Sequence, residues 1–127
     1  MVLNYSAIGI TVELWDGSSV FFTIADIAEA AATALHQIKA SMSVIEGSNI
    51  TLSCTYTGSV YSLHWYRQQP GARPEFLLLI DEASEHVTQA QPPHPQLSTK
   101  LDKKNTKVDL LISSVTVTDS ALYYCAL

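Results

Sequence analysis

The segment Asp119–Cys125 (DSALYYC) carries the pattern from which the fold of this 127-residue chain is predicted. Its last residue, Cys125, has one candidate partner in the chain, Cys54, and Trp65 lies eleven residues after Cys54. If the two cysteines lie on facing β-sheets, their disulfide crosses the core and the tryptophan packs against it. Tyr123 lies just before Cys125, where its hydroxyl can hold the preceding turn. The combined spacing of these four residues predicts a two-layer β-sandwich.

Alternation of apolar and polar residues supports an all-β structure through the C-terminal two-thirds of the chain. Leu52 and Cys54 alternate with polar residues, which is the period of a half-buried strand. The segment Gln69–Ala72 (QPGA) is typical of a turn. Gln91–Pro95 (QPPHP) is excluded from a central strand because proline donates no ladder hydrogen bond. Further strands are predicted within Leu63–Gln68, Phe76–Ile80, Val108–Ile112 and Ala121–Cys125.

The composition is that of a globular domain, with 47% apolar and 15% charged residues. A formal net charge of −5 argues against a nucleic-acid-binding protein, which needs a basic face to meet phosphates. No uncharged apolar run approaches the roughly 18 residues of a membrane-spanning helix. The amino terminus also makes a poor secretory leader, because its first basic residue is Lys39 and acidic residues interrupt its apolar segments. The cysteine pair nevertheless indicates an oxidising compartment.

Residues 1–38 differ in pattern from the rest of the chain. Apolar residues alternate through Ile10–Leu14 up to a hairpin signal at Asp16-Gly17, and residues 24–38 follow helical spacing. A hairpin and one helix are too small to fold alone, so this part either docks on its neighbour or stays loose. Three interpretations are open: residues from a wrong gene start or a retained intron that replace the true leader, a divergent uncleaved leader, and a hairpin–helix accessory.

Residues 39–127 carry a set of motifs that is specific in combination. With these motifs the chain resembles a variable-type immunoglobulin domain, most closely a T-cell receptor alpha (or delta) variable segment. The resemblance implies a V-type β-sandwich over residues 39–127, with residues 1–38 as an extension outside the family pattern. Trp65–Gly71 and Pro74–Leu78 favour an alpha-like chain over an antibody chain. The motifs are Val44–Gly47 (VIEG), Leu52–Cys54 (LSC), Trp65–Gly71 (WYRQQPG), Leu110–Ile112 (LLI) and Asp119–Ala126 (DSALYYCA).

The resemblance implies antigen recognition by loops at one end of the sandwich, where a peptide displayed on a histocompatibility (MHC) molecule is bound. The two loops fall within residues 55–62 and 81–87. Tyrosine suits such loops, because it offers a large contact area at a small cost in side-chain entropy. The implied contact residues are Tyr56, Thr57, Ser59, Tyr61, Glu82, Ser84 and Glu85.

A second surface is implied for a partner chain. A T-cell receptor beta-like chain would form a heterodimer through the face carrying Tyr66, Gln68, Pro74 and Tyr124. Strand parity agrees, because Trp65 pointing inward turns Tyr66 and Gln68 outward. The complete receptor would lie on the extracellular side of the plasma membrane. Signalling subunits would be reached only through constant and membrane regions that this chain does not carry.

The chain departs from the family pattern in two further places. It stops at Leu127, just after the second cysteine, without a third loop and a joining strand. We therefore expect one sheet to lack its last strand and to keep an open edge. Gln96 stands where the family has an arginine paired to the aspartate of the final turn, here Asp119. We expect a hydrogen bond from a neutral donor to replace that ion pair, at some loss of stability.

No catalytic, metal or cofactor site is predicted. Asp81, Glu82, Glu85 and His86 do not have the spacing of a closed ligand set, and the four histidines are scattered along the chain. Asn49 and Asn4 begin N-glycosylation patterns, and whether either is used stays open. The predicted function is therefore that of a binding module. The alternative is a V-type domain of a non-rearranging immune or adhesion receptor.

Overall fold

The structure, a computed structural model, describes residues 5–13 and 38–127. The predicted Asp16-Gly17 turn and the predicted helix lie outside these residues, except that Ile38 begins a strand. Within the two described ranges, no helix is long and apolar enough to cross a membrane.

The described residues form nine strands and one short 3₁₀ helix. The elements are β1 (Tyr5–Glu13), β2 (Ile38–Ile45), β3 (Ile50–Thr55), β4 (Ser62–Gln68), β5 (Glu75–Asp81), β6 (Val87–Gln89), β7 (Leu97–Asp102), β8 (Lys107–Ile112), a 3₁₀ helix η1 (Val117–Asp119) and β9 (Ala121–Ala126).

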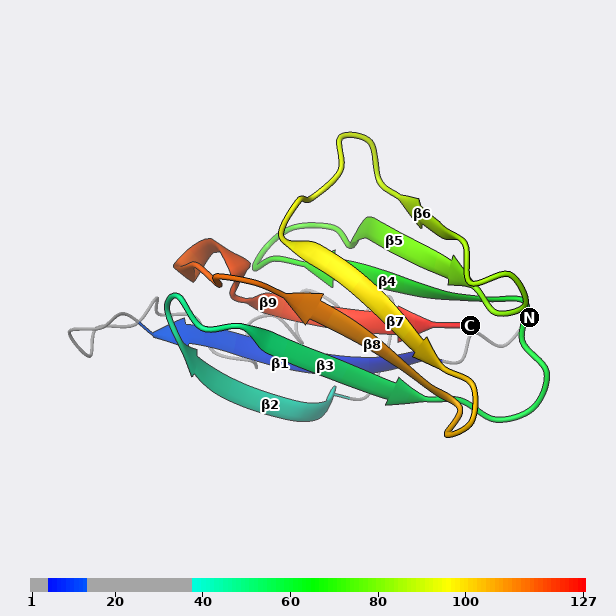
Figure 1. Cartoon of the computed structure of the whole chain (residues 1–127). Coiled ribbons are helices and arrows are strands. Elements are labelled where there is room, and N and C mark those ends of the chain that lie inside the picture. The colour runs from blue at the N-terminus through cyan, green and yellow to red at the C-terminus, as the bar shows by residue number, and fades with distance from the viewer. Residues whose placement is uncertain (1–4, 14–37) are drawn as a thin grey trace.

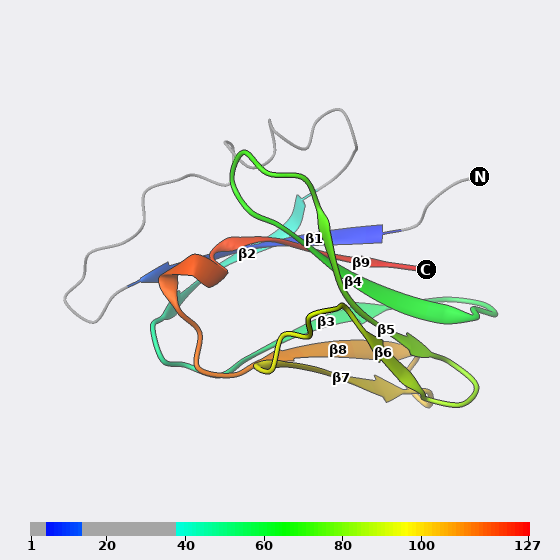
Figure 2. The ribbon, with the colours of Figure 1, turned by 90° about the horizontal axis from the view of Figure 1, so that it is seen from above.

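The strands form two sheets that face each other (Figures 1 and 2). One sheet has the order β2-β1-β9-β4-β5-β6, and the other has the order β3-β8-β7. Every neighbouring pair is antiparallel except β1 and β2, which run parallel. This arrangement confirms the predicted all-β two-layer sandwich.

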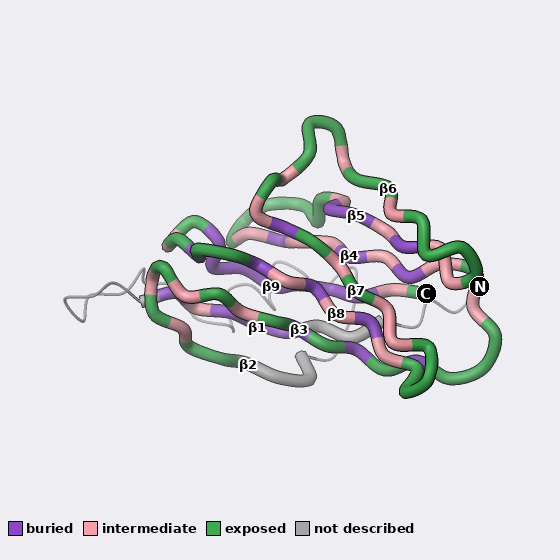
Figure 3. Tube along the Cα trace, viewed as in Figure 1, coloured by how far each residue is buried: buried purple, intermediate pink, exposed green. Residues whose placement is uncertain are grey.

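The core lies between the two sheets and contains the predicted cross-link. The Cys54–Cys125 disulfide joins β3 of one sheet to β9 of the other, with the two Cα atoms 6.6 Å apart. Trp65 is fully buried in the same hydrophobic cluster, as the spacing predicts. Strands β3 and β8 bury alternate residues, so the three-stranded sheet turns its other face to solvent (Figure 3).

Strand β9 differs from β3 and β8 because it is buried on both of its faces (Figure 3). Ala121, Tyr123 and Cys125 belong to the core between the sheets. Leu122 and Tyr124 alternate with them and are still only 1% and 6% exposed. A central strand with both faces covered has little freedom to shift its register, because a slip of one residue would misplace every side chain.

The expected open edge is wrong, because β1 pairs with β9 along that edge. The antiparallel ladder runs from Tyr5 opposite Ala126 to Ile10 opposite Ala121. The other edge of β1 pairs with β2, so the N-terminal strand lies inside the sheet (Figure 2). The physical reason is the apolar alternation of β1, since Ile10 and its neighbours two residues away fill core positions that would otherwise be empty.

Candidate functional site

The first predicted loop connects β3 to β4 at one end of the sandwich. Tyr61 is 95% exposed, and Thr57 and Ser59 are exposed as well. Tyr56 is placed differently from the prediction, because it is only 5% exposed and belongs to the core cluster. Its backbone N–H donates to the carbonyl of Thr106 at 2.9 Å, which continues the pattern of β3 by one residue. The Tyr56 ring therefore packs in the core beneath the loop and is not exposed for contact with a ligand.

The second predicted loop, residues 81–87, is organised by one carboxylate. The Asp81 Oδ1 atom accepts hydrogen bonds from the backbone N–H of Ser84 at 2.9 Å and of Ala83 at 3.0 Å, and from Ser84 Oγ at 3.1 Å. These bonds stabilise the charged carboxylate, and those from Ser84 in particular lower the pKa of Asp81. Ser84 and Glu85 are exposed and Glu82 is half-buried. The loop thus presents polar side chains on a locally fixed backbone.

The two loops lie against each other. The backbone N–H of Glu82 donates to the carbonyl of Tyr61 at 2.9 Å, which ties the second loop to the first. Beside this contact is a shallow pocket of about 330 Å³, lined by the first loop and the end of the chain. The described residues around this end contain no group of metal ligands. Its chemistry is that of a polar and aromatic contact surface.

Three of the predicted chain-pairing residues, Tyr66, Gln68 and Tyr124, share one face of the six-stranded sheet, and Pro74 lies directly before β5. The Tyr124 hydroxyl donates to Gln68 Oε1 at 2.5 Å, and Gln68 Nε2 donates to the carbonyl of Ala72 at 2.9 Å. Gln68 is 3% exposed, so its amide is satisfied within the chain. Tyr66 is half-buried and Pro74 is exposed. Parity therefore predicts the side of the sheet correctly, although not how deeply Gln68 and Tyr124 are buried.

Two aromatic residues that the sequence analysis did not select lie beside Tyr66. The rings of His64 and Phe76 have centroids 6.2 Å and 5.8 Å from the Tyr66 ring, and 6.3 Å from each other. His64 Nε2 also lies 2.8 Å from Ser62 Oγ. Burial lowers the pKa of His64, because the charged imidazolium loses hydration there. The alternation of β4 was the available signal, since His64 and Tyr66 are both outward positions.

The opposite end of the sandwich contains the buried carboxylate of Asp119, which is 4% exposed. Gln96 Nε2 donates to Asp119 Oδ1 at 2.7 Å, which confirms the predicted neutral donor. Arg67 also reaches this oxygen, with a guanidinium nitrogen 3.6 Å away, while its Nε donates to Glu75 at 2.9 Å. The contact of Arg67 with Asp119 was not predicted from the sequence. Asp119 therefore keeps a cationic neighbour despite the glutamine at position 96.

The predicted tyrosine contact is present at the same end. The Tyr123 hydroxyl donates to the backbone carbonyl of Asp119 at 2.7 Å, across the turn that contains η1. The backbone N–H of Thr116 donates to Asp119 Oδ2 at 2.7 Å. Burial raises the pKa of Tyr123, so the hydroxyl stays protonated and keeps donating.

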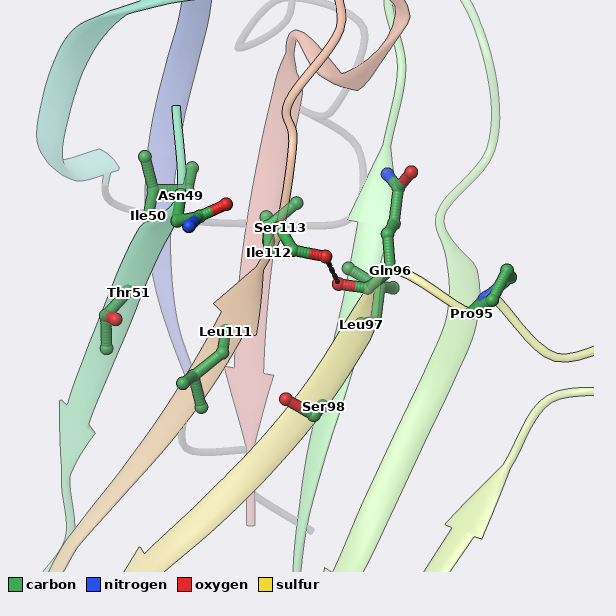
Figure 4. A pocket seen from close by; sticks show the side chains of 10 residues that line it. All are labelled: Asn49, Ile50, Thr51, Pro95, Gln96, Leu97, Ser98, Leu111, Ile112 and Ser113. Atoms are coloured by element: carbon green, nitrogen blue, oxygen red, sulfur yellow. Dashed lines mark hydrogen bonds between the residues drawn. The ribbon is translucent and has the colours of Figure 1, made fainter. Parts of the chain in front are cut away.

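A second shallow pocket, of about 290 Å³, lies where β3 and β7 begin and β8 ends (Figure 4). Ser113 Oγ donates to the carbonyl of Gln96 at 3.3 Å across it. Asn49 is exposed at its rim, and its Oδ1 accepts from the backbone N–H of Ser114 at 2.9 Å. Glycosylation at Asn49 stays a prediction, and the exposure of this side chain is compatible with it.

Comparison with known proteins gives consistent matches to one family. Residues 37–127 match the model of the immunoglobulin V-set domain. Human T cell receptor alpha variable 34 is 31% identical over 91 residues, which cover 72% of this chain and 77% of the relative. Human T cell receptor alpha variable 5 is 37% identical over 86 residues, covering 67% and 72%. The human immunoglobulin iota chain is 38% identical over 97 residues, covering 73% and 66%.

Proposed function

The chain belongs to the immunoglobulin V-set family, as a domain of the T-cell receptor alpha variable type, and from this premise we propose that it recognises peptide–MHC ligands in a heterodimer with a beta-like chain. The relatives are receptor domains, so the proposal is a binding module and not an enzyme. In the complete receptor this module faces the extracellular side of the plasma membrane. Signalling subunits are then reached through constant and membrane regions.

The observation that carries the antigen-binding proposal is the exposed tyrosine on a joined pair of loops. Tyr61 is 95% exposed, and its backbone carbonyl accepts the hydrogen bond from Glu82 that holds the second loop beside it. An exposed tyrosine on a restrained backbone loses little entropy on binding and buries a large area. The proposed contact residues around it are Thr57, Ser59, Glu82, Ser84 and Glu85.

The pairing proposal rests on the aromatic face of β4 and β5. Tyr66 and Phe76 form an edge-to-face pair, and exposed Pro74 extends this face. Aromatic side chains are enriched among the residues that dominate binding energy in protein interfaces. Gln68 and Tyr124 are buried and bonded to each other on the same face, so they hold the pairing surface in place beneath Tyr66.

Two matched tyrosine variants test both parts of the proposal. The chain is co-expressed with a T-cell receptor beta chain, and the dissociation constant of the heterodimer is measured by analytical ultracentrifugation. Tyr66→Ala is expected to weaken pairing about tenfold, and Tyr61→Ala to leave it unchanged. On cells, Tyr61→Ala is expected to reduce peptide–MHC multimer staining. Absence of any heterodimer with beta chains, or equal pairing by both variants, contradicts the pairing proposal.

One observation favours the second candidate, a V-type domain of a non-rearranging immune or adhesion receptor. Strand β1 occupies the edge of β9 along which a joining strand would have to pair. A receptor that never adds such a strand has no conflict with β1. Sequencing transcripts across both ends of the coding segment separates the candidates, because diverse joining sequence after Ala126 supports the first and a single fixed continuation supports the second.

A further inference from the structure

We propose that the edge of β9 is a strand-binding site and that Tyr5–Glu13 is its in-chain ligand, present to complete the six-stranded sheet. This proposal goes beyond receptor function and does not depend on it. It concerns a segment outside the matched family region, which begins at residue 37. The ligand class is an extended segment with apolar residues at alternate positions, bound by main-chain hydrogen bonds along a sheet edge.

The backbone of β1 is paired on both sides. Its ladder with β9 is antiparallel from Tyr5 to Ile10, and its ladder with β2 is parallel from Ala7 to Glu13. A strand at a sheet edge leaves a row of N–H and C=O groups without partners, which invites pairing with another chain. Strand β1 satisfies those groups on β9 and leaves β2 as the outer strand.

The side chains of β1 are part of the core. Ile8, Ile10 and Val12 are 9%, 1% and 0% exposed, and all three belong to the same hydrophobic cluster as Trp65. Ile10 lies opposite Ala121, where a small residue leaves room for a larger one across the ladder. These contacts bury the strand as deeply as the family strands β3 and β8, so β1 is a component of the sandwich.

A hydrogen bond outside the regular ladders fixes the register. The backbone N–H of Val12 donates to Ser120 Oγ at 2.9 Å, and this contact is buried. Ser120 is the residue directly before β9 and is 2% exposed. A shift of β1 by one residue would break this bond and turn Ile10 away from the core. The edge of β9 therefore binds the Tyr5–Glu13 segment in a single register.

Occupation by β1 excludes any other strand from the same edge, because each main-chain group of β9 is paired once. A strand that returned from the end of β9, or the β1 segment of a second copy, would have to displace Tyr5–Glu13 first. The inference also selects among the three interpretations of the N-terminus for residues 5–13. These residues work as a structural accessory of the mature domain.

The first test is a matched pair of substitutions in the full chain. Ile10 is 1% exposed in β1, whereas Ile45 is 49% exposed in β2. Ile10→Asp is expected to lower the Tm by about 10 °C or more and to convert monomer into larger species on size-exclusion chromatography. Ile45→Asp is expected to change the Tm by less than about 2 °C. Equal Tm shifts for the two variants would overturn the proposal.

Milder measurements keep the proposal testable where Ile10→Asp does not fold. Ile10→Val is expected to lower the Tm by about 3 °C, and Ile45→Val by less than about 1 °C. In the unmodified chain, hydrogen exchange at the amides of residues 8–12 is expected to be at least about 100-fold slower than in a free peptide of the same sequence. Exchange at the rate of the free peptide would show that β1 does not occupy the edge.

Discussion

The two ends of the sandwich are built in different ways. At the turn end, which we define by Asp119 and the residues that contact it, hydrogen bonds join segments far apart in the chain. Gln96 and Arg67 both reach the Asp119 carboxylate, and Gln69 reaches the carbonyl of Thr118 at 2.8 Å. At the loop end, which we define as residues 57–62 and 81–86, the Asp81 carboxylate accepts hydrogen bonds from residues two and three positions further on.

The difference teaches how a sandwich can change its loops and keep its fold. The side-chain hydrogen bonds of Asp81 close within its loop. The hydrogen bonds to other segments are accepted by main-chain carbonyls, from Glu82 N–H to Tyr61 and from Lys103 Nζ to Ala83. A loop of this kind can change its side chains without removing side-chain acceptors from another strand.

The turn end does not allow this, because the buried Asp119 carboxylate is held by Gln96 and Arg67 from distant segments as well as by the nearby Thr116 N–H. We therefore expect substitutions at the turn end to cost stability and matched substitutions at the loop end to cost almost none.

The largest difference between the ends is expected for a carboxylate. Asp119→Ala removes the acceptor of Gln96 Nε2 and of the Thr116 N–H and takes a counter-charge from Arg67, all in a buried setting. We expect the free energy of unfolding to fall by about 3 kcal/mol. Glu82→Ala at the loop end removes only a partly exposed ion pair of 3.9 Å with Lys103, and we expect a change below about 0.5 kcal/mol.

Urea unfolding at pH 7 measures both values. The comparison fails if the two alanine variants lose the same stability, because the buried contacts of Asp119 would then contribute no more than a surface pair. A change in the dependence of the unfolding free energy on urea would indicate instead that the unfolded ensemble changed.

The glutamine at position 96 gives the next effect. Gln96→Ala removes a hydrogen bond to a buried charged group and leaves Arg67 as the cation near Asp119, so we expect a loss of about 1.5 kcal/mol. Gln89→Ala, at an exposed position of β6, is the matched control and is expected to stay within about 0.5 kcal/mol of the unmodified chain. Thermal unfolding of the three proteins checks this, and an equal Tm for both variants would remove Gln96 from the network.

Removing a single tyrosine hydroxyl at each end of the sandwich compares the stability that one hydroxyl contributes at the turn end and at the loop end. Tyr123→Phe removes only the hydroxyl that donates to the carbonyl of Asp119, and we expect a loss of about 1 kcal/mol. Tyr61→Phe removes a hydroxyl from a side chain that is 95% exposed, and we expect no measurable change in stability. Denaturation midpoints measured side by side decide the matter. A loss at Tyr61 as large as that at Tyr123 would mean that the loop end also carries stability.

Local sequence patterns predicted the parts of the molecule in which the constraint is local or shared by the family. Alternation predicted the strands, and cysteine and tryptophan spacing predicted the disulfide between β3 and β9. The Gln96–Asp119 bond was predicted from a departure at a family position.

The missed features depend on contacts between distant segments. The pattern near Ile10 predicted a strand that belongs to a hairpin through Asp16-Gly17 and did not predict its pairing with β9 and β2, because any sheet edge accepts a strand of that pattern. Arg67 has inward parity with Trp65, yet its contact with Asp119 depends on the pairing of β4 with β9 and on the turn η1 that precedes β9. The resemblance placed Tyr56 in the first loop, although the pattern of β3 continues one residue beyond Thr55 and buries its ring.

The smallest expected effect concerns the pH dependence beside the loop end, where His64 of β4 is half-buried next to Tyr66. Burial lowers the pKa of His64 below its ordinary value of 6.5. The folded chain therefore binds fewer protons at this site than the unfolded chain, and the stability present above pH 6.5 is lost as the pH falls below it. Between pH 7.5 and 5.5, we expect the unmodified protein to lose more unfolding free energy than the His64→Gln variant loses. The difference between these two losses is expected to be smaller than the loss caused by Tyr123→Phe.

Asp81 and Asp102 do not titrate in this pH range, because their hydrogen bonds keep their pKa values below 3.8. Equal pH dependence in both proteins would mean that the His64 ring is as well hydrated in the folded chain as in the unfolded one.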